Sequence, residues 1–366
     1  MMAIEVQDIF SAHFGEYAKK RVLSPIQQKA ANAIMNCRTA ALGAHVDVCD
    51  SCGYMRISYN SCRNRHCPKC QTFAKEVWID QQHISLLNTH YFHVVFTVPS
   101  ELDQTILHNQ RTAYALLFQA SSETVLELCA DRKYLGAKPG ITAVLHTWGQ
   151  NLQFHPHVHM IVTGGGLTLG AKWRRSKRDF FLPIHVLSAK FRGKFLALLK
   201  KEFPNTDKSL LDVCYVKKWV VYCKPPFGSS EQVVAYLGRY THRVAISNNR
   251  ILSLENGKVT FLWRDYAHGS KVKPMTLDAE EFIRRFLLHI LPSGFRKIRH
   301  YGLFSLRDKG RRLALCRKLT NTPQPRPAAT TIERLQKILG SNFNVCPCCG
   351  NGFLSRDPPA VAVSSI

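Results

Sequence analysis

The feature that most constrains this chain is a cysteine-rich segment between residues 37 and 70. Cys49 and Cys52 form one Cys-x-x-Cys pair, and Cys67 and Cys70 form a second pair fourteen residues further on. Two such pairs offer four thiolates to one tetrahedral Zn²⁺, at a separation close to that of zinc ribbons. The alternative is four ordinary buried thiols. The spacing predicts a structural zinc domain, because four thiolates leave no open position for catalysis.

Other cysteines and histidines widen this interpretation. The thirteen cysteines are an odd number and are clustered, which favours metal binding over disulfides. Further candidate zinc ligands, for a second site or in place of one of the four, are Cys37, His45, Cys62 and His66. Ordinary thiols and a satisfied histidine would explain these residues equally well. The tail cysteines 346, 348 and 349 make half a ligand set, so no zinc site is predicted there.

The charge of the chain indicates a polyanionic partner. Its 366 residues carry 50 Lys and Arg against 25 Asp and Glu, a net charge of +25. Nucleic acid is the first candidate partner and an anionic membrane surface the second. No run of 18 apolar residues exists to span a membrane, and the first residues lack a secretion signal. We therefore expect a cytoplasmic protein.

Local patterns predict an α+β fold with a mostly antiparallel sheet. Ser24, Pro25 and Gln27 predict a capped helix start, and Asn256-Gly257 predicts a hairpin within 250–266. Helical patterns cover 24–37, 71–87, 111–135, 188–202, 231–243 and 280–291, the last after an Asp278–Glu281 capping box. Strand patterns cover 91–98, 140–149, 155–166 with an end at its three glycines, and 214–223. Strands and helices alternate irregularly, which argues against a doubly wound parallel sheet.

Changes in composition suggest three parts. Residues 1–90 are expected to form a small helical and zinc-ribbon-like domain, and residues 91–318 a second, larger domain. A proline-rich stretch begins near residue 320, so residues 319–366 are expected to be a linker and a short cysteine-containing tail.

Three histidines alternate along one predicted strand. His155, His157 and His159 project to one face, whereas Val158 points to the other. A row of imidazoles would repel if protonated and would cost desolvation if buried without partners. A divalent ion removes both problems, because neutral imidazole is a good ligand. The strand predicts a metal site with open positions, which is typical of catalysis.

Two tyrosines lie four residues apart in a predicted helix. Tyr236 and Tyr240 would share one face, one turn apart. A phenol has a pKa near 10 and needs nearby positive charge to act as a nucleophile. Arg239, His242 and Arg243 provide such charge. From the spacing alone, two aromatic rings that pack on the sheet are the simpler explanation.

Several of these motifs together resemble a known class of enzyme. HPHVHMIVTGGG resembles the HUH motif (histidine, hydrophobic, histidine) of rolling-circle nucleases, and YLGRY resembles their paired-tyrosine motif. YNSCRNRHCPKCQ, HVVFTVPSEL, NLQFHPHVH and FIRRFLLHILPSGFRKIRHYG are similar to the HUH transposases of bacterial insertion sequences, of the insertion sequence ninety-one type. The resemblance runs from about residue 10 to 315, with the motifs in the expected order.

The resemblance implies a fold, a reaction and roles for named residues. It implies that residues 91–318 are an HUH catalytic domain with helices beside a central antiparallel sheet, after an N-terminal zinc-binding domain. His157 and His159 would hold Mg²⁺ or Mn²⁺, with His155 as third ligand by geometry and Gln153 as a weaker candidate. Tyr236 and Tyr240 would attack DNA in turn, leaving a 5′-phosphotyrosine and a free 3′-OH. Two nucleophiles suit rolling-circle transposition of single strands.

DNA is the expected partner, especially single-stranded transposon ends and targets. No helicase P-loop is present in the sequence, so unwinding would fall to a host helicase, and association with the bacterial nucleoid is expected. The oligomeric state is left open. Basic residues could contact phosphates while aromatic rings stack on bases, although solvated basic loops would look the same. The candidates are Arg63, Arg65, Lys172, Arg174, Arg175, Arg239 and Arg243.

Two other functions fit the same sequence. A plasmid rolling-circle replication initiator would use the same chemistry, although the zinc domain and the insertion-sequence-like motifs favour a transposase. A non-catalytic, zinc-containing DNA-binding regulator would share the charge and the cysteines but would not cleave DNA.

Overall fold

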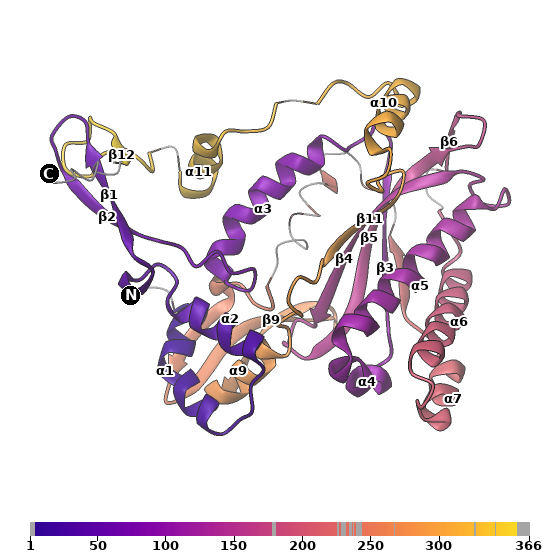
Figure 1. Ribbon diagram of the computed structural model, residues 1–366, viewed down its shortest axis with the longest axis horizontal. Helices are drawn as coiled ribbons and strands as arrows, with labels where there is room; N and C mark the ends of the chain where they lie inside the picture. Colours follow the sequence, from indigo (N-terminus) through magenta and orange to yellow (C-terminus); the bar gives the residue numbers. More distant parts are fainter. Residues whose placement is uncertain are drawn as a thin grey trace, which may run out of the picture.

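A central antiparallel sheet organises the protein. The computed structural model describes residues 4–177, 181–224, 227, 232–233, 236, 238, 244–266, 268–325, 327–340 and 342–356. The strands of this sheet are β3 (Tyr91–Thr97), β4 (Lys138–Trp148), β5 (Phe154–Leu167), β6 (Trp173–Arg175), β7 (Val221–Lys224) and β11 (Ile298–Gly302). Their order is β11-β4-β5-β3-β7, and β6 pairs with β5 outside that order (Figure 1). The pairings between these strands are antiparallel, so the predicted fold class is confirmed.

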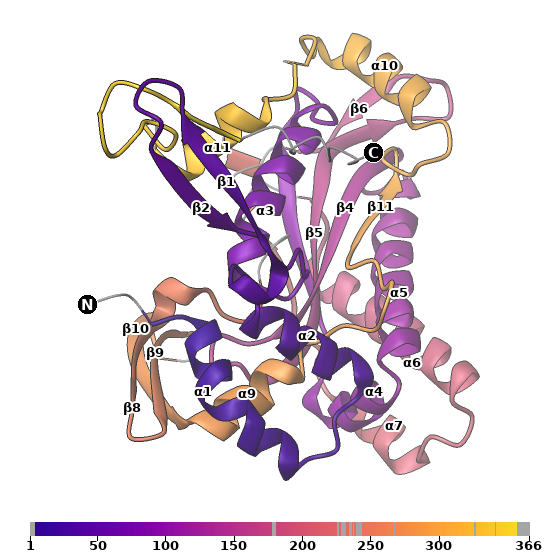
Figure 2. The same cartoon turned by 60° about the vertical axis from the view of Figure 1, so that its left-hand side comes forward.

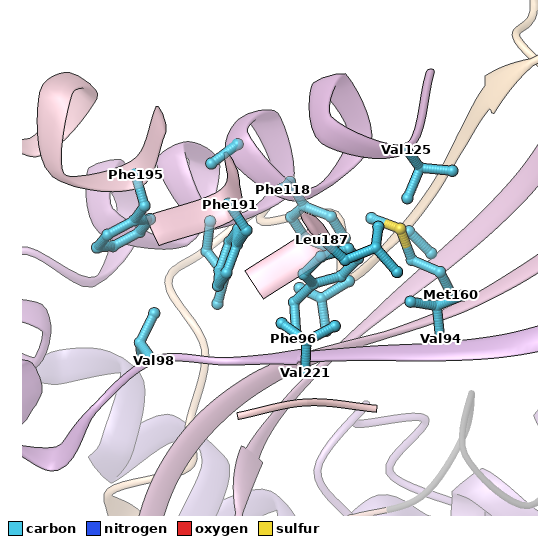
Figure 3. Packing of buried hydrophobic residues seen from close by; sticks show 14 of the residues in the cluster. Val94, Phe96, Val98, Phe118, Val125, Met160, Leu187, Phe191, Phe195 and Val221 are labelled. Carbon is cyan, nitrogen blue, oxygen red and sulfur yellow. The ribbon is translucent and has the colours of Figure 1, made fainter. Parts of the chain in front are cut away.

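Helices cover one face of this sheet and bury its apolar side chains. They are α4 (Asp103–His108), α5 (Gln110–Ala130), α6 (Ile184–Glu202) and α7 (Lys208–Val216). Phe96 on β3 and Met160 on β5 point toward Phe118, Phe191 and neighbouring side chains of the helices (Figure 3). Each fully buried side chain of this size contributes about 1.5–3 kcal/mol. The opposite face of the sheet, where the histidines lie, is therefore fixed by this core.

A second layer combines helices from the start of the chain with strands and a helix from residues 251–287. Its helices are α1 (Val6–Lys19), α2 (Pro25–Met35) and α9 (Ala279–Leu287), and its sheet is β8 (Ile251–Glu255), β9 (Lys258–Asp265) and β10 (Lys271–Asp278). Phe10 of α1 and Phe286 of α9 meet edge to face, 5.2 Å between ring centroids. The expected capping box forms at the start of α2, where Ser24 and Gln27 bond each other's backbone. The N-terminal helices thus share a core with residues 245–290.

The predicted hairpin forms where expected, whereas one helix cap does not. Asn256 and Gly257 adopt φ of 49° and 70°, the two positive values that a tight hairpin turn between β8 and β9 requires. Helix α9 begins after Asp278, but no side-chain cap forms there. Glu281 instead binds Arg284 and Arg285, at 2.6 and 2.7 Å. The helix prediction is right, and the capping box is wrong because arginines one turn later compete for the carboxylate.

A third small sheet brings the two ends of the chain together. It has the order β12-β1-β2, with β1 (Ala44–Cys49), β2 (Met55–Tyr59) and β12 (Leu354–Arg356). Beside it lie α3 (Pro68–His83) and α11 (Thr331–Leu339), while α10 (Lys309–Thr320) precedes the connection (Figures 1 and 2). Arg334 of α11 pairs with Asp80 of α3 at 2.6 Å, and both side chains are largely buried. The region expected to be a linker and tail therefore contains a helix and a strand that dock on the N-terminal third.

Two predicted elements differ from the structure. Strand β5 does not end at Gly164 but continues to Leu167. Its glycines have no side chains, so the backbones of the adjacent strands can approach closely. A Cβ on Gly166 would lie 2.5 Å from the carbonyl oxygen of Lys138 on the next strand. The predicted strand 214–223 is helix α7 followed by the short β7. The Asp207 side chain caps α7 by accepting from the Ser209 amide at 2.9 Å.

The structure also bears on membrane association. Among the described residues, no helix combines the length and the apolar character that crossing a bilayer would require.

The turn at the end of β11 offers a test of the fold. Gly302 has φ of 62°, and a Cβ there would collide with the backbone carbonyl of Pro139. We expect Gly302→Ala to lower the free energy of unfolding by about 2–4 kcal/mol. Gly310→Ala is the control, because Gly310 lies in α10 with no heavy atom within 4 Å of an added Cβ. Thermal melting should fall by several degrees for the first variant only, and equal melting temperatures would contradict this account of the turn.

Candidate functional site

The register of β4, β5 and β3 gathers imidazoles on the face opposite the helical core. His146 of β4 lies opposite His157 of β5. Residues directly opposite in an antiparallel pair share one face. His159 follows on the same face, and His93 of β3 lies one diagonal step from it, opposite Ile161. Four histidines from three strands therefore meet at one place.

Three of these histidines have the geometry of a metal site. His146, His157 and His159 each offer a ring nitrogen, and the three nitrogens lie within 4.8 Å of one another. His155, the third ligand expected from alternation, is exposed and lies outside this set. Gln153 is also exposed, and its side-chain oxygen accepts from Asn151 at 2.8 Å. Strand β4 thus supplies the third imidazole, that of His146, whereas β5 supplies only two.

Hydrogen bonds hold two of the rings in a ligand orientation. The Nδ1 of His157 lies 2.7 Å from the carbonyl oxygen of His155, so this nitrogen carries the proton and Nε2 keeps its lone pair. The Nδ1 of His159 lies 2.9 Å from the Nε2 of His93. Such outer partners orient ligand imidazoles and raise their basicity. Burial lowers the pKa of His157 to about 3, so its ring is neutral and able to bind a metal at neutral pH.

His93 connects this cluster to one of the predicted nucleophiles. Its Nδ1 lies 3.0 Å from the hydroxyl oxygen of Tyr236, and the two rings meet edge to face. Burial lowers the pKa of His93 to about 3, so it is neutral as well. His93 is not among the residues predicted from the sequence, because a lone histidine in an apolar strand carries no local signal. Only its diagonal position relative to His159 reveals it.

The tyrosine segment is described in part. Gln232, Val233, Tyr236 and Gly238 are helical, in agreement with the predicted helix over 231–243. Tyr240, Arg239 and Arg243 lie outside the described residues. Val233 and Tyr236 pack with Trp78 and Ile79 of α3.

The predicted zinc ligands are distributed over two separate clusters. Cys67 and Cys70, at the start of α3, lie with Cys37 and Cys62, and the four sulfurs are within 4.8 Å of one another. The Sγ of Cys70 lies 3.7 Å from that of Cys37 and 3.5 Å from that of Cys62. An edge of a tetrahedral zinc–thiolate site is about 3.8 Å, from Zn–S bonds of about 2.3 Å. This cluster therefore fits one structural zinc.

The structure does not bring the other predicted pair to this cluster. Cys49 and Cys52 lie with Cys346 and Cys349 of the tail instead. His45 and His66 join neither group. His45 lies 3.8 Å from Asp47, and His66 lines a small cavity beside Trp148 and His289.

The predicted DNA-binding residues occupy two regions. Arg63 is exposed, whereas the guanidinium of Arg65 donates to the carbonyl of Phe295 at 2.7 Å. Lys172, Arg174 and Arg175 line a surface hollow of about 950 Å³ next to β6. Arg132 and Lys138 line the same hollow, together with Trp173. The hollow is therefore strongly basic, and no acidic side chain is among the described residues that line it.

Comparison with known proteins gives the family. Residues 9–98 match the transposase zinc-binding domain, and residues 140–312 match the family described as "Putative transposase". Putative transposase y4qJ of Sinorhizobium fredii (strain NBRC 101917 / NGR234) is 46% identical over 371 residues, 95% of this chain and 93% of that protein. The transposase for insertion sequence element IS801 of Pseudomonas savastanoi pv. phaseolicola is 27% identical over 347 residues, 90% of this chain and 83% of that protein. No solved structure matches the chain significantly.

The chain belongs to the IS91-like transposases. Members of this family act on DNA and cleave it, so the transposase is a DNA-binding enzyme, and the expected resemblance is confirmed. The cluster of Cys37, Cys62, Cys67 and Cys70 lies wholly within the matched zinc-binding domain. Structural zinc is therefore a feature of this transposase.

The histidine geometry leads to a test with bound metal as the readout. We expect His146→Ala to weaken Mn²⁺ binding at least about tenfold, because it removes one of three converging nitrogens. His155→Ala should bind Mn²⁺ nearly as the unmodified protein does, because the hydrogen bond to His157 comes from the backbone carbonyl of residue 155, which the substitution keeps. Titration calorimetry and the electron paramagnetic resonance spectrum of Mn²⁺ measure both variants. The reverse order of affinities would restore His155 as the ligand.

Proposed function

We propose that this transposase nicks single-stranded DNA at the ends of its element and joins strands through 5′-phosphotyrosine intermediates, driving rolling-circle transposition. One observation carries the proposal. The hydroxyl of Tyr236 is linked through His93 to His159, one of three histidines that converge as metal ligands. A nucleophile and an electrophilic site are thus joined by two hydrogen bonds.

In this proposal His146, His157 and His159 hold the catalytic divalent ion. Mg²⁺ prefers oxygen ligands, so of the two predicted ions Mn²⁺ suits three imidazoles better. The ion supplies Lewis-acid polarisation of the scissile phosphate. Burial keeps His157 neutral, so the lone pair of its ring would be available to the ion.

The hydrogen bonds assign a proton to each nitrogen along the relay. If Nε2 of His159 is the ligand atom, its proton is on Nδ1 and is donated to Nε2 of His93. His93 then carries its own proton on Nδ1 and donates it to the oxygen of Tyr236. A donor aimed at this oxygen stabilises the phenolate as it forms. His93 therefore acts on Tyr236 as a hydrogen-bond donor rather than as a base.

The cleavage step follows from this arrangement. The phenol proton of Tyr236 passes to water, and the phenolate oxygen forms a bond to phosphorus while the bond from phosphorus to O3′ breaks. The electron pair stays on O3′, which takes up a proton, and the 5′-phosphate remains on the tyrosine. Tyr240, one helical turn away in sequence, is the proposed second nucleophile, so one cleaved end is held while another strand is cut.

The basic hollow beside β6 is the proposed path of the strand. It adjoins Gly165–Leu167 of β5, which pair with β6. Gly165 is six residues from His159, or about 20 Å along the strand. Cations at this distance would bind backbone phosphates several nucleotides from the cleaved bond.

A covalent adduct is the direct test of the chemistry. Single-stranded DNA that carries the element ends, labelled at its 3′ end, is incubated with protein and Mn²⁺ without nucleotide. We expect a protein–DNA adduct that disappears in the Tyr236→Phe, Tyr240→Phe double variant and forms about 100-fold more slowly in His93→Ala. Tyr222→Phe, at an exposed tyrosine of β7, should retain the adduct.

The same assay separates the alternatives. An adduct that survives the double tyrosine variant would refute the proposed nucleophiles. Tight binding without any adduct on all DNA ends would favour the regulator. Cleavage of a plasmid origin in preference to element ends would favour the replication initiator.

The DNA path has its own test. We expect the Lys172→Ala, Arg175→Ala double variant to bind single-stranded DNA more weakly. The slope of log affinity against log salt should fall by about 0.7 for each phosphate that the variant no longer neutralises. Lys200→Ala with Lys201→Ala is the matched control, because these exposed lysines lie at the far end of α6. Fluorescence anisotropy at several salt concentrations measures both. Equal weakening in the two double variants would mean that only net charge matters.

A further inference from the structure

Two similar turns from opposite ends of the chain face each other across the small third sheet. Each has the pattern Cys-x-x-Cys-Gly, one over residues 49–53 and the other over residues 346–350. The sulfur of Cys49 lies 3.8 Å from that of Cys349, and the sulfur of Cys52 lies 3.7 Å from that of Cys346. All four sulfurs are within 4.8 Å of one another.

Both turns have the backbone geometry of a metal knuckle. Gly53 and Gly350 adopt φ of 73° and 71°, and each glycine amide bonds the carbonyl of the first cysteine of its turn. The amides of residues 51 and 52 point at the sulfur of Cys49, each at 3.4 Å. The amide of Gly352 points at the sulfur of Cys349 at 3.3 Å. Such donors stabilise thiolates and fix their direction.

The geometry points to a second structural zinc site, formed by Cys49, Cys52, Cys346 and Cys349. Its sulfur separations match the edge of about 3.8 Å that a tetrahedral zinc–thiolate site requires. They exceed the disulfide bond length of about 2.05 Å, and all four cysteines are free thiols. The site lies half outside the matched zinc-binding domain, which ends at residue 98. It goes beyond the proposed function and does not depend on it.

The tail is fitted closely around this site. The amide of Phe353 donates to the side chain of Asp50 at 2.8 Å, and β12 pairs with β1. A Cβ on Gly352 would lie 2.5 Å from the sulfur of Cys49, so only glycine leaves room for the knuckle. These contacts form between segments about 300 residues apart in the chain.

The proposed zinc site would support helix α3, which packs against Tyr236. The tail reaches the site through α11, whose Arg334 and Lys337 pair with Asp80 and Glu76 of α3, both at 2.6 Å. Helix α3 also contributes Trp78 and Ile79 to the hydrophobic cluster that contains Tyr236. Zinc at the ends of the chain would therefore hold α11 on α3. Only this consequence rests on the proposed role of Tyr236.

Zinc content provides the test on the full-length protein. We expect native mass spectrometry and elemental analysis to find two zinc ions in the unmodified chain. The Cys346→Ser, Cys349→Ser double variant should retain one. Cys348→Ser is the matched control, because Cys348 lies in the same turn but outside the cluster, and it should retain two. One zinc in the unmodified chain, or two in the double variant, would overturn the site.

A measurement on the unmodified protein keeps the test independent of how the variants fold. Cys52 and Cys348 are both exposed, so both would react with an alkylating reagent if neither bound metal. We expect Cys52, Cys346 and Cys349 to be protected until a chelator is added, and Cys348 to react throughout. Peptide mass spectrometry reads each position. Equal reaction of Cys52 and Cys348 before the chelator is added would refute zinc binding, whatever the state of the tyrosine chemistry.

Discussion

The pairing of β4 with β5 is the constraint on which the candidate active site depends. It sets His146 opposite His157 while Leu145 and Val158 face the helices. A shift of one residue would turn the imidazoles into the apolar core and the apolar residues toward the metal face. The burial of aliphatic and aromatic side chains under α5 and α6 therefore fixes the positions of the candidate ligands. Stability and the arrangement of the histidines come from the same register.

Helix α3 connects this register to the cysteine cluster of the zinc-binding domain. Cys67 precedes its first residue and Cys70 lies in its first turn, while its far half packs against the tyrosine segment. A Cβ on Gly238 would collide with Ile79, so the two helical segments approach without a side chain between them. Displacement of α3 would therefore be transmitted directly to Tyr236. The zinc-binding domain is therefore part of the support of the candidate active site.

Local chemistry made much of the fold predictable. The alternation in β5, the Asn256-Gly257 turn and the Ser24 cap each act within a few residues, and each is found as expected. His146 and His93 could not be selected in this way, because their roles arise from strand register between segments far apart in sequence. The three glycines of β5 were expected to end the strand for the same reason, because their role also depends on neighbouring strands. Because glycine has no side chain, these positions leave room for the backbones of β4 and β6, and local sequence does not reveal that these strands lie so close.

The division of the cysteines shows why nearness in sequence is a weak guide to a zinc site. A Cys-x-x-Cys pair fixes two ligands and leaves the other two free to come from anywhere. Cys52 and Cys346 are 294 residues apart, against fifteen between Cys52 and Cys67. Closing the longer loop costs only about 3 kcal/mol more, since the cost grows with the logarithm of length. Binding of zinc by four ligands releases about 10–16 kcal/mol. The folded positions of the strands, rather than loop length, thus decide which pairs meet.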